Sequence, residues 1–146
     1  GPDAVCVDRR RGEPGRRSDD RNKGRIRGYV LEGRFKRGVG AVVLSRPTWF
    51  AVDGDRLLVL EFRPPRLTVL DSADRLIGYL AEDAEAPARE GWPNEVAADG
   101  KPQRTQSLQP GRLNSPHSLA LDRQGNIYIT EWLIGGRLIK LKKLSG

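Results

Sequence analysis

Residues 47–53 read PTWFAVD, and residues 116–122 read PHSLALD. The two stretches share their first and last residues and carry apolar residues between them. The correspondence continues downstream, where residues 57–61 (LLVLE) match residues 127–131 (IYITE). Short runs rich in Val, Ile, Leu and aromatic residues, bounded by Gly, Pro, Asp and Asn, are typical of antiparallel strands and turns. The sequence therefore predicts two copies of one unit of strands.

The unit includes a third strand, and a more degraded copy of it opens the chain. Residues 66–69 (RLTV) match residues 137–140 (RLIK) as the third strand. Near the start, residues 4–8 (AVCVD) match the second strand and residues 24–27 (GRIR) match the third. Residues 32–35 (EGRF) correspond to the turn into a fourth strand. Repeated units of four short antiparallel strands predict an all-β fold of β-propeller blades.

The predicted organisation is one partial propeller over residues 1–146, with about three four-stranded antiparallel blades. The first blade covers residues 3–40 and contains a charged insertion at 12–23. The second blade covers 44–82 and the third 115–144, with a long proline-containing loop at 84–114 between them. The strands expected in the second and third blades are residues 49–52, 57–61, 67–70, 76–80, 118–121, 127–131 and 137–141.

The composition limits the classes of function that the chain can have. The 146 residues carry a net charge of +7, with a balance of +6 in residues 1–40, −5 in 41–100 and +6 in 101–146. The single cysteine excludes an internal disulfide framework, and the single histidine excludes a self-contained multi-histidine metal site. We find no apolar run of membrane-spanning length and no signal peptide, so we expect a soluble chain without a membrane partner. The cellular location stays unassigned.

Residues 116–122, 125–131 and 136–138 together resemble an NHL repeat, whose usual form is PHGIAVD, then GNIYVAD, then NRI. Within the NHL proteins, the succession of three unequal blades is most similar to six-bladed peptidyl-α-hydroxyglycine amidating lyases and their bacterial relatives. The resemblance covers residues 3–144 and corresponds to the C-terminal half of that propeller. It implies that the chain forms half of a six-bladed ring.

The resemblance also implies two site residues. In the lyases, three histidines from different blades hold a zinc ion, and His117 occupies the Pro-His step of the last blade. Arg9, just after the residues 6–8 (CVD), matches an arginine that lines the active site. The other two histidines and the catalytic tyrosine belong to blades upstream of this chain. Because a catalytic zinc needs about three protein ligands, His117 cannot hold it alone. A histidine that packs near the channel and hydrogen-bonds to the backbone is the favoured alternative.

Acidic and basic residues recur at equivalent places of the three units. An acid ends each second strand and an arginine starts each third strand, which predicts structural ion pairs across strands or between blades. These residues are Asp8, Glu61 and Glu131 with Arg25, Arg66 and Arg137. The tryptophans differ in context: Trp49 is expected in the core, Trp132 between blades and Trp92 over the mouth of the channel.

The predicted first blade lacks its first strand and the last blade lacks its fourth. Open sheet edges favour association, so we expect a homo-oligomer, most simply a dimer that closes a six-bladed ring. The leading functional hypothesis is a binding or scaffold propeller with a small-molecule or peptide ligand. One alternative is a zinc-dependent C–N lyase assembled in an oligomer or in a longer parent protein. Another is anion or RNA binding by the basic residues 9–11 and 16–17, which the lack of interleaved aromatic residues disfavours.

Overall fold

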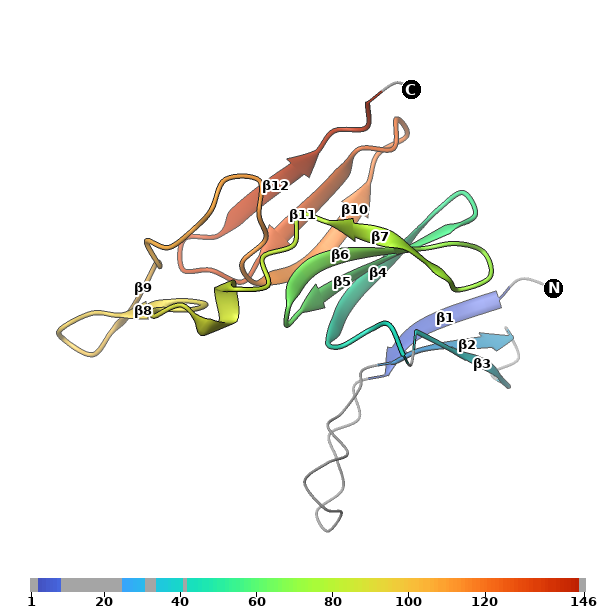
Figure 1. The fold of residues 1–146 in the computed structure, drawn as a ribbon, viewed down its shortest axis with the longest axis horizontal. Helices are drawn as coiled ribbons and strands as arrows, with labels where there is room; N and C mark the ends of the chain where they lie inside the picture. The colour runs from blue at the N-terminus through green and yellow to red at the C-terminus, as the bar shows by residue number, and fades with distance from the viewer. Residues whose placement is uncertain (1–2, 9–24, 31–33, 41, 145–146) are drawn as a thin grey trace, which may run out of the picture.

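The computed structural model describes residues 3–8, 25–30, 34–40 and 42–144. In these residues the chain is almost entirely β, with antiparallel sheets and one short 3-10 helix. Three sheets follow one another through the molecule in the order of the chain (Figure 1). A separate two-stranded hairpin projects from the long loop between the second and third sheets. The all-β prediction is confirmed.

The strands pair in simple sequential order. The first sheet contains β1 (Asp3–Asp8), β2 (Arg25–Val30) and β3 (Phe35–Val39). The second sheet contains β4 (Pro47–Asp53), β5 (Arg56–Phe62), β6 (Pro65–Leu70) and β7 (Leu76–Leu80). The third sheet contains β10 (Pro116–Leu121), β11 (Ile127–Glu131) and β12 (Arg137–Leu141). The hairpin contains β8 (Glu95–Val96) and β9 (Pro102–Gln103), preceded by the 3-10 helix η1 (Ala86–Ala88).

The strands predicted in the second and third units are confirmed, and four strands in one sheet, as expected for each of the three units, are found in one of them. Only the second sheet has four strands; within the described residues the first and third sheets have three each. The pairing registers preserve the repeat, because Glu61 lies opposite Arg66 and Glu131 opposite Arg137. In the first sheet Asp8 lies opposite Arg25 in the same way. The insertion predicted at 12–23 lies outside the described residues.

Two apolar clusters hold the three sheets face to face. One joins the second sheet to the third and centres on Leu60, Leu67 and Ile129, which are fully buried. The other joins the first sheet to the second and includes Ile26 and Leu70, also fully buried. Burial of aliphatic side chains from two facing sheets is the main stabilising contribution in such a stack.

Two tryptophans lie in surroundings other than those predicted. Trp49 is 48% exposed, so the prediction that it lies in the core is wrong. A register shift between Pro47 and Trp49 sets which side chains of β4 face inward, and Phe50 packs on the core instead. Trp132 is 67% exposed in this chain and does not lie between packed sheets.

Residues 84–114 have a defined structure in spite of their four prolines. Trp92 ties this loop to the second sheet, since its ring packs on Phe62 with ring centroids 4.9 Å apart. Its indole nitrogen donates a hydrogen bond to the Asn114 carbonyl oxygen at 2.8 Å. Trp92 thus fixes the loop to the sheet edge. None of the described residues forms a helix with the length and apolar character needed to cross a membrane.

Candidate functional site

The first strands of the second and third sheets, β4 and β10, lie side by side (Figure 1). Both strands begin with a proline, and both have a register shift directly after it. The Thr48 hydroxyl of β4 donates a hydrogen bond to the Pro116 carbonyl oxygen of β10 at 3.2 Å. His117 is the residue of β10 that corresponds to Thr48, and its side chain is exposed. The starts of these two strands therefore form one continuous surface that includes His117.

A buried carboxylate fixes the entrance to β4. The Glu61 side chain, at the end of β5, is fully buried and accepts a hydrogen bond from the Ser45 backbone nitrogen at 2.5 Å. Its other oxygen accepts from Arg66 Nε and from the Thr68 hydroxyl, both at 2.6 Å. Arg66 in turn donates to the Val43 carbonyl oxygen at 3.2 Å. The pair therefore ties the segment before β4 to the β5–β6 hairpin.

The third sheet repeats this arrangement at the entrance to β10. Glu131 Oε2 accepts a hydrogen bond from Arg137 Nε at 2.5 Å. Glu131 Oε1 accepts from the backbone nitrogens of Asn114 at 2.5 Å and Ser115 at 3.2 Å. Arg137 donates to the Arg112 carbonyl oxygen at 2.6 Å. We call Glu61–Arg66 and Glu131–Arg137 the Glu–Arg anchors. They confirm the ion pairs predicted for the second and third units.

Arg66 of the first anchor is held in its charged form. Burial by itself lowers the pKa of Arg66, but the hydrogen bond and negative charge of Glu61 outweigh it and raise the pKa above its ordinary value. Glu82 contributes through a second contact with the guanidinium at 3.1 Å. Because the buried charges are paired and fully hydrogen-bonded, their desolvation is offset within the sheet.

The residues implied by the family resemblance are only partly described. His117 lies at the exposed start of β10, as given above, whereas Arg9 lies outside the described residues. No group of three His, Cys, Asp or Glu side chains within the described ranges is placed to hold a metal ion. Since zinc in proteins takes three or four such ligands, the described surroundings of His117 do not fit a zinc site by themselves.

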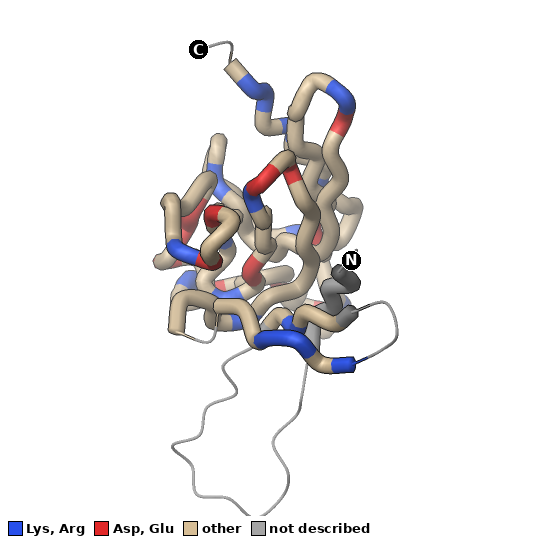
Figure 2. The backbone as a smooth tube through the Cα atoms, turned by 90° about the vertical axis from the view of Figure 1, so that its right-hand side faces the viewer, with Lys and Arg blue, Asp and Glu red and all other residues tan. Residues whose placement is uncertain are grey.

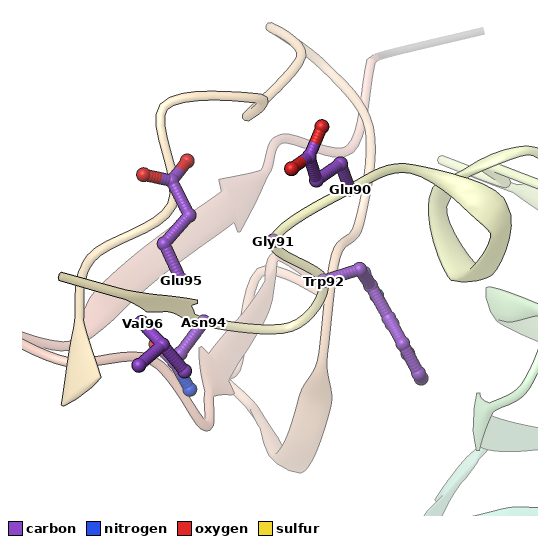
Figure 3. Close-up of a pocket in the computed structure, with 6 residues that line it drawn as sticks. All are labelled: Glu90, Gly91, Trp92, Asn94, Glu95 and Val96. Carbon is purple, nitrogen blue, oxygen red and sulfur yellow. The ribbon is translucent and has the colours of Figure 1, made fainter. Parts of the chain in front are cut away.

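A cavity of about 540 Å³ opens beside the β8–β9 hairpin and is lined by Glu90, Trp92, Asn94 and Glu95 among others (Figure 3). Glu95 is already engaged, since it accepts hydrogen bonds from the Gln106 backbone nitrogen at 2.6 Å and the Thr105 hydroxyl at 3.1 Å. These hydrogen bonds lower the pKa of Glu95, and the bond from the Gln106 backbone has the largest effect. Glu95 on the cavity wall is thus held by donors of its own loop, and Trp92 reaches from the wall to the second sheet.

Sequence reasoning missed one cluster beside this cavity. The Arg63 guanidinium lies over the Trp92 ring, 5.3 Å from its centroid, on the same ring that contacts Phe62. Trp92, predicted over the mouth of the channel, covers the end of β5. The only signal available was the position of Phe62 directly after the anchor residue Glu61.

No protein-family model matches the chain, and no curated protein matches it significantly. Functional inference therefore depends on the residues and their geometry.

Proposed function

We propose that this chain is a binding scaffold made of NHL-type β-propeller blades and related to the amidating lyases. The observation that carries this proposal is the recurrence of the Glu–Arg anchor. In two sheets the same acid, the same arginine and the same backbone contacts hold the entrance to the first strand. Sheets that repeat both their internal bonding and their face-to-face packing behave as units of one array.

The ligand-binding surface in this proposal is formed by the starts of β4 and β10. Thr48 and His117 hold equivalent positions in these two strands. The Glu–Arg anchors fix the segments that lead into β4 and β10. Rigidly held strand ends and loops are the usual carriers of binding residues, because their position is fixed while their chemistry varies. A small molecule or a peptide fits a surface of this kind.

The proposal includes completion of the ring by a second copy. A second copy would cover exposed apolar side chains such as Phe35 on β3, which is 59% exposed, and Leu138 on β12, which is 66% exposed. Size-exclusion chromatography with light scattering tests this: we expect twice the chain mass of 16.2 kDa. Phe35→Asp is expected to yield the monomer, whereas Val42→Asp, at a side chain that is 92% exposed in a loop, leaves the mass unchanged. A well-folded monomer at every concentration contradicts ring closure.

Anion or RNA binding is a second candidate. The basic residues 9–11 and 16–17 predicted for it lie outside the described residues, but one observation on the first sheet favours it. The rings of Tyr29 and Phe35 meet edge to face with centroids 5.9 Å apart, and the Arg27 guanidinium lies 5.8 Å from the Phe35 centroid. Lys and Arg gather in the same region (Figure 2). Aromatic and basic side chains on one sheet are suited to stacking with bases and pairing with phosphates.

A fluorescent oligouridine titrated with the full chain tests this candidate. Binding that weakens steeply with salt and is lost in Phe35→Ala supports the candidate. Counterion release from phosphates causes the salt dependence, and base stacking on the ring causes the dependence on Phe35. Binding that salt weakens but Phe35→Ala leaves intact reflects charge alone and contradicts a stacking site.

The zinc-dependent lyase alternative has its own test. Its ligands beyond His117 would have to come from another copy or a longer parent chain. Metal analysis of the purified protein, with His117→Ala as control, decides between the two outcomes. Zinc that is stoichiometric in the unsubstituted protein and absent from His117→Ala supports the alternative. A metal content that the substitution leaves unchanged contradicts it.

A further inference from the structure

The sequence contains two Asp-Gly steps, and each lies in the turn of a β-hairpin. Asp53 and Gly54 lead from β4 into β5, and Asp99 and Gly100 lie between β8 and β9. Both glycines are exposed. An aspartate before glycine can react with its own backbone, because glycine has no side chain to shield the amide nitrogen. The contacts of that nitrogen and of the aspartate carboxylate therefore determine how reactive each step is.

The structure leaves both reacting groups of the first step without a partner among the described residues. Asp53 pairs with Arg56, so Gly54 and Asp55 form the turn. Within the described ranges no donor reaches the Asp53 carboxylate, and the Gly54 nitrogen has no acceptor. Gly54 has a φ angle of +62°, and a Cβ atom there would meet no other atom within 4 Å. The space around the Gly54 nitrogen is therefore open.

Both reacting groups of the second step are engaged. The Gly100 nitrogen donates a hydrogen bond to the Ala97 carbonyl oxygen at 2.9 Å. Asp99 Oδ1 accepts from the Lys101 backbone nitrogen at 3.1 Å, and Lys101 Nζ lies 3.0 Å from Asp99 Oδ2. Reaction at this step requires these contacts to break first. The two turns thus share the same dipeptide but differ in what holds its reacting atoms.

We propose that Asp53 is a site of spontaneous modification, at which the folded chain converts aspartate to isoaspartate. The Gly54 nitrogen attacks Asp53 Cγ, so a C–N bond forms and the Cγ–O bond breaks. The carboxyl hydroxyl leaves with the amide proton as water, and a succinimide ring remains. Water then adds to the ring at the backbone carbonyl carbon and breaks its bond to nitrogen. The Cγ–N bond becomes the main-chain link, and the α-carboxylate becomes the side group.

The modification changes the strand that packs beside the third sheet. Isoaspartate adds one methylene group to the main chain at the end of β4, which alters the spacing that pairs Asp53 with Arg56. β4 packs beside β10, and its Ala51 contacts the cluster between the second and third sheets. We therefore expect the modified chain to exchange its amide hydrogens faster around this turn. The inference goes beyond the proposed function and depends on neither the repeat nor ring closure.

The test is a timed incubation of the full chain at neutral pH and physiological temperature. Peptide mapping by chromatography and electron-transfer mass spectrometry distinguishes isoaspartyl from aspartyl peptides at each step. We expect isoaspartate to accumulate at residue 53 at least about tenfold faster than at residue 99, because the contacts of Asp99 and Gly100 add to the barrier there. In concentrated urea, where both turns are unfolded, the two steps should react at similar rates.

Two variants complete the test, and both retain the negative charge. Asp53→Glu is expected to remove the modification at this turn, because the longer side chain would have to close a larger ring. Asp99→Glu, the same change in the other hairpin, should leave the isoaspartate yield at residue 53 unchanged. Equal accumulation at the two steps in the folded chain overturns the proposal, as does a rate ratio that is the same with and without urea. A total isoaspartate yield that Asp53→Glu does not lower also overturns it.

Discussion

Glu61 and Arg66 form a buried ion pair across the β5–β6 hairpin, with 2.6 Å between Oε2 and Nε. The Glu61 side chain is fully buried and that of Arg66 is 11% exposed. Glu61 also accepts a hydrogen bond from the Ser45 backbone nitrogen. The pair therefore joins β5 and β6 to the segment that leads into β4. The same connection recurs at Glu131 and Arg137, which makes the pair a feature that the second and third sheets share.

Glu61→Gln is expected to lower the free energy of unfolding by about 3 kcal/mol, because it removes the buried counter-charge of Arg66 and leaves only the partly exposed Glu82 carboxylate beside it. Urea denaturation followed by circular dichroism measures this loss. Glu90→Gln, at an exposed carboxylate on the loop, is the matched control and is expected to change stability by less than about 0.5 kcal/mol. A loss for Glu61→Gln as small as that of the control contradicts the role assigned to the anchor.

The sequence was sufficient to predict the strands of the second and third sheets and their anchors. Both follow from a pattern in which an acid and an arginine recur at fixed places relative to aliphatic strands, as in residues 57–66 and 127–137. The inward face of β4 was not predictable, because residues 49–52 are all apolar and show no alternation. The register shift after Pro47 determined that Phe50 rather than Trp49 faces the core.

The contact between Phe62 and Trp92 could not be predicted for a different reason. Phe62 and Trp92 are separated by two turns, two strands and part of a loop without periodicity, so no local rule brings them together. The surroundings of His117 likewise depend on long-range packing of β10 against β4. A site assembled from such contacts is visible only in three dimensions.

Trp92→Ala is expected to detach residues 84–114 from the second sheet. The substitution removes the ring contact with Phe62, the Arg63 contact and the hydrogen bond to Asn114, and we expect it to cost about 2 kcal/mol. Hydrogen exchange should accelerate across the loop. Trp132→Ala makes the same change at a ring that is 67% exposed, and is expected to be nearly neutral. Equal losses in the two variants are incompatible with this account.

Asp122 organises the turn between β10 and β11, and its ionisation should depend on Asn126. The Asn126 side chain donates to Asp122 Oδ2 at 2.7 Å, and with backbone and Tyr128 donors it lowers the pKa of Asp122. Asn126→Ala is expected to raise that pKa toward its ordinary value, measured by NMR titration of the carboxyl carbon. Gln124→Ala keeps the backbone nitrogen that donates to Asp122 Oδ1, so it should leave the pKa of Asp122 unchanged.

The consequence for stability has a definite sign. A carboxyl whose pKa is lower in the folded state stabilises the fold above its unfolded-state pKa of about 3.9 and loses that contribution as the pH falls through the folded value. The parent chain should therefore exceed Asn126→Ala in stability most at neutral pH, and the difference should shrink under acid. A difference between the two proteins that stays constant down to acid pH would exclude ionisation of Asp122 as its source.

Gly40 ends the first sheet in a conformation that other residues resist. Its φ angle is +75°, and its carbonyl oxygen accepts hydrogen bonds from the nitrogens of Val43 at 3.0 Å and Leu44 at 2.7 Å. A Cβ atom at Gly40 would collide with the side chain of Leu44, which is buried in the cluster between the first and second sheets. Gly40→Ala is therefore expected to cost about 2 kcal/mol in thermal or urea unfolding. Gly38→Ala, two residues earlier in β3, meets no atom within 4 Å and should be neutral or slightly stabilising. If Gly38→Ala destabilised the chain as much as Gly40→Ala, the cost would come from altering β3 itself rather than from the turn that places Leu44 between the sheets.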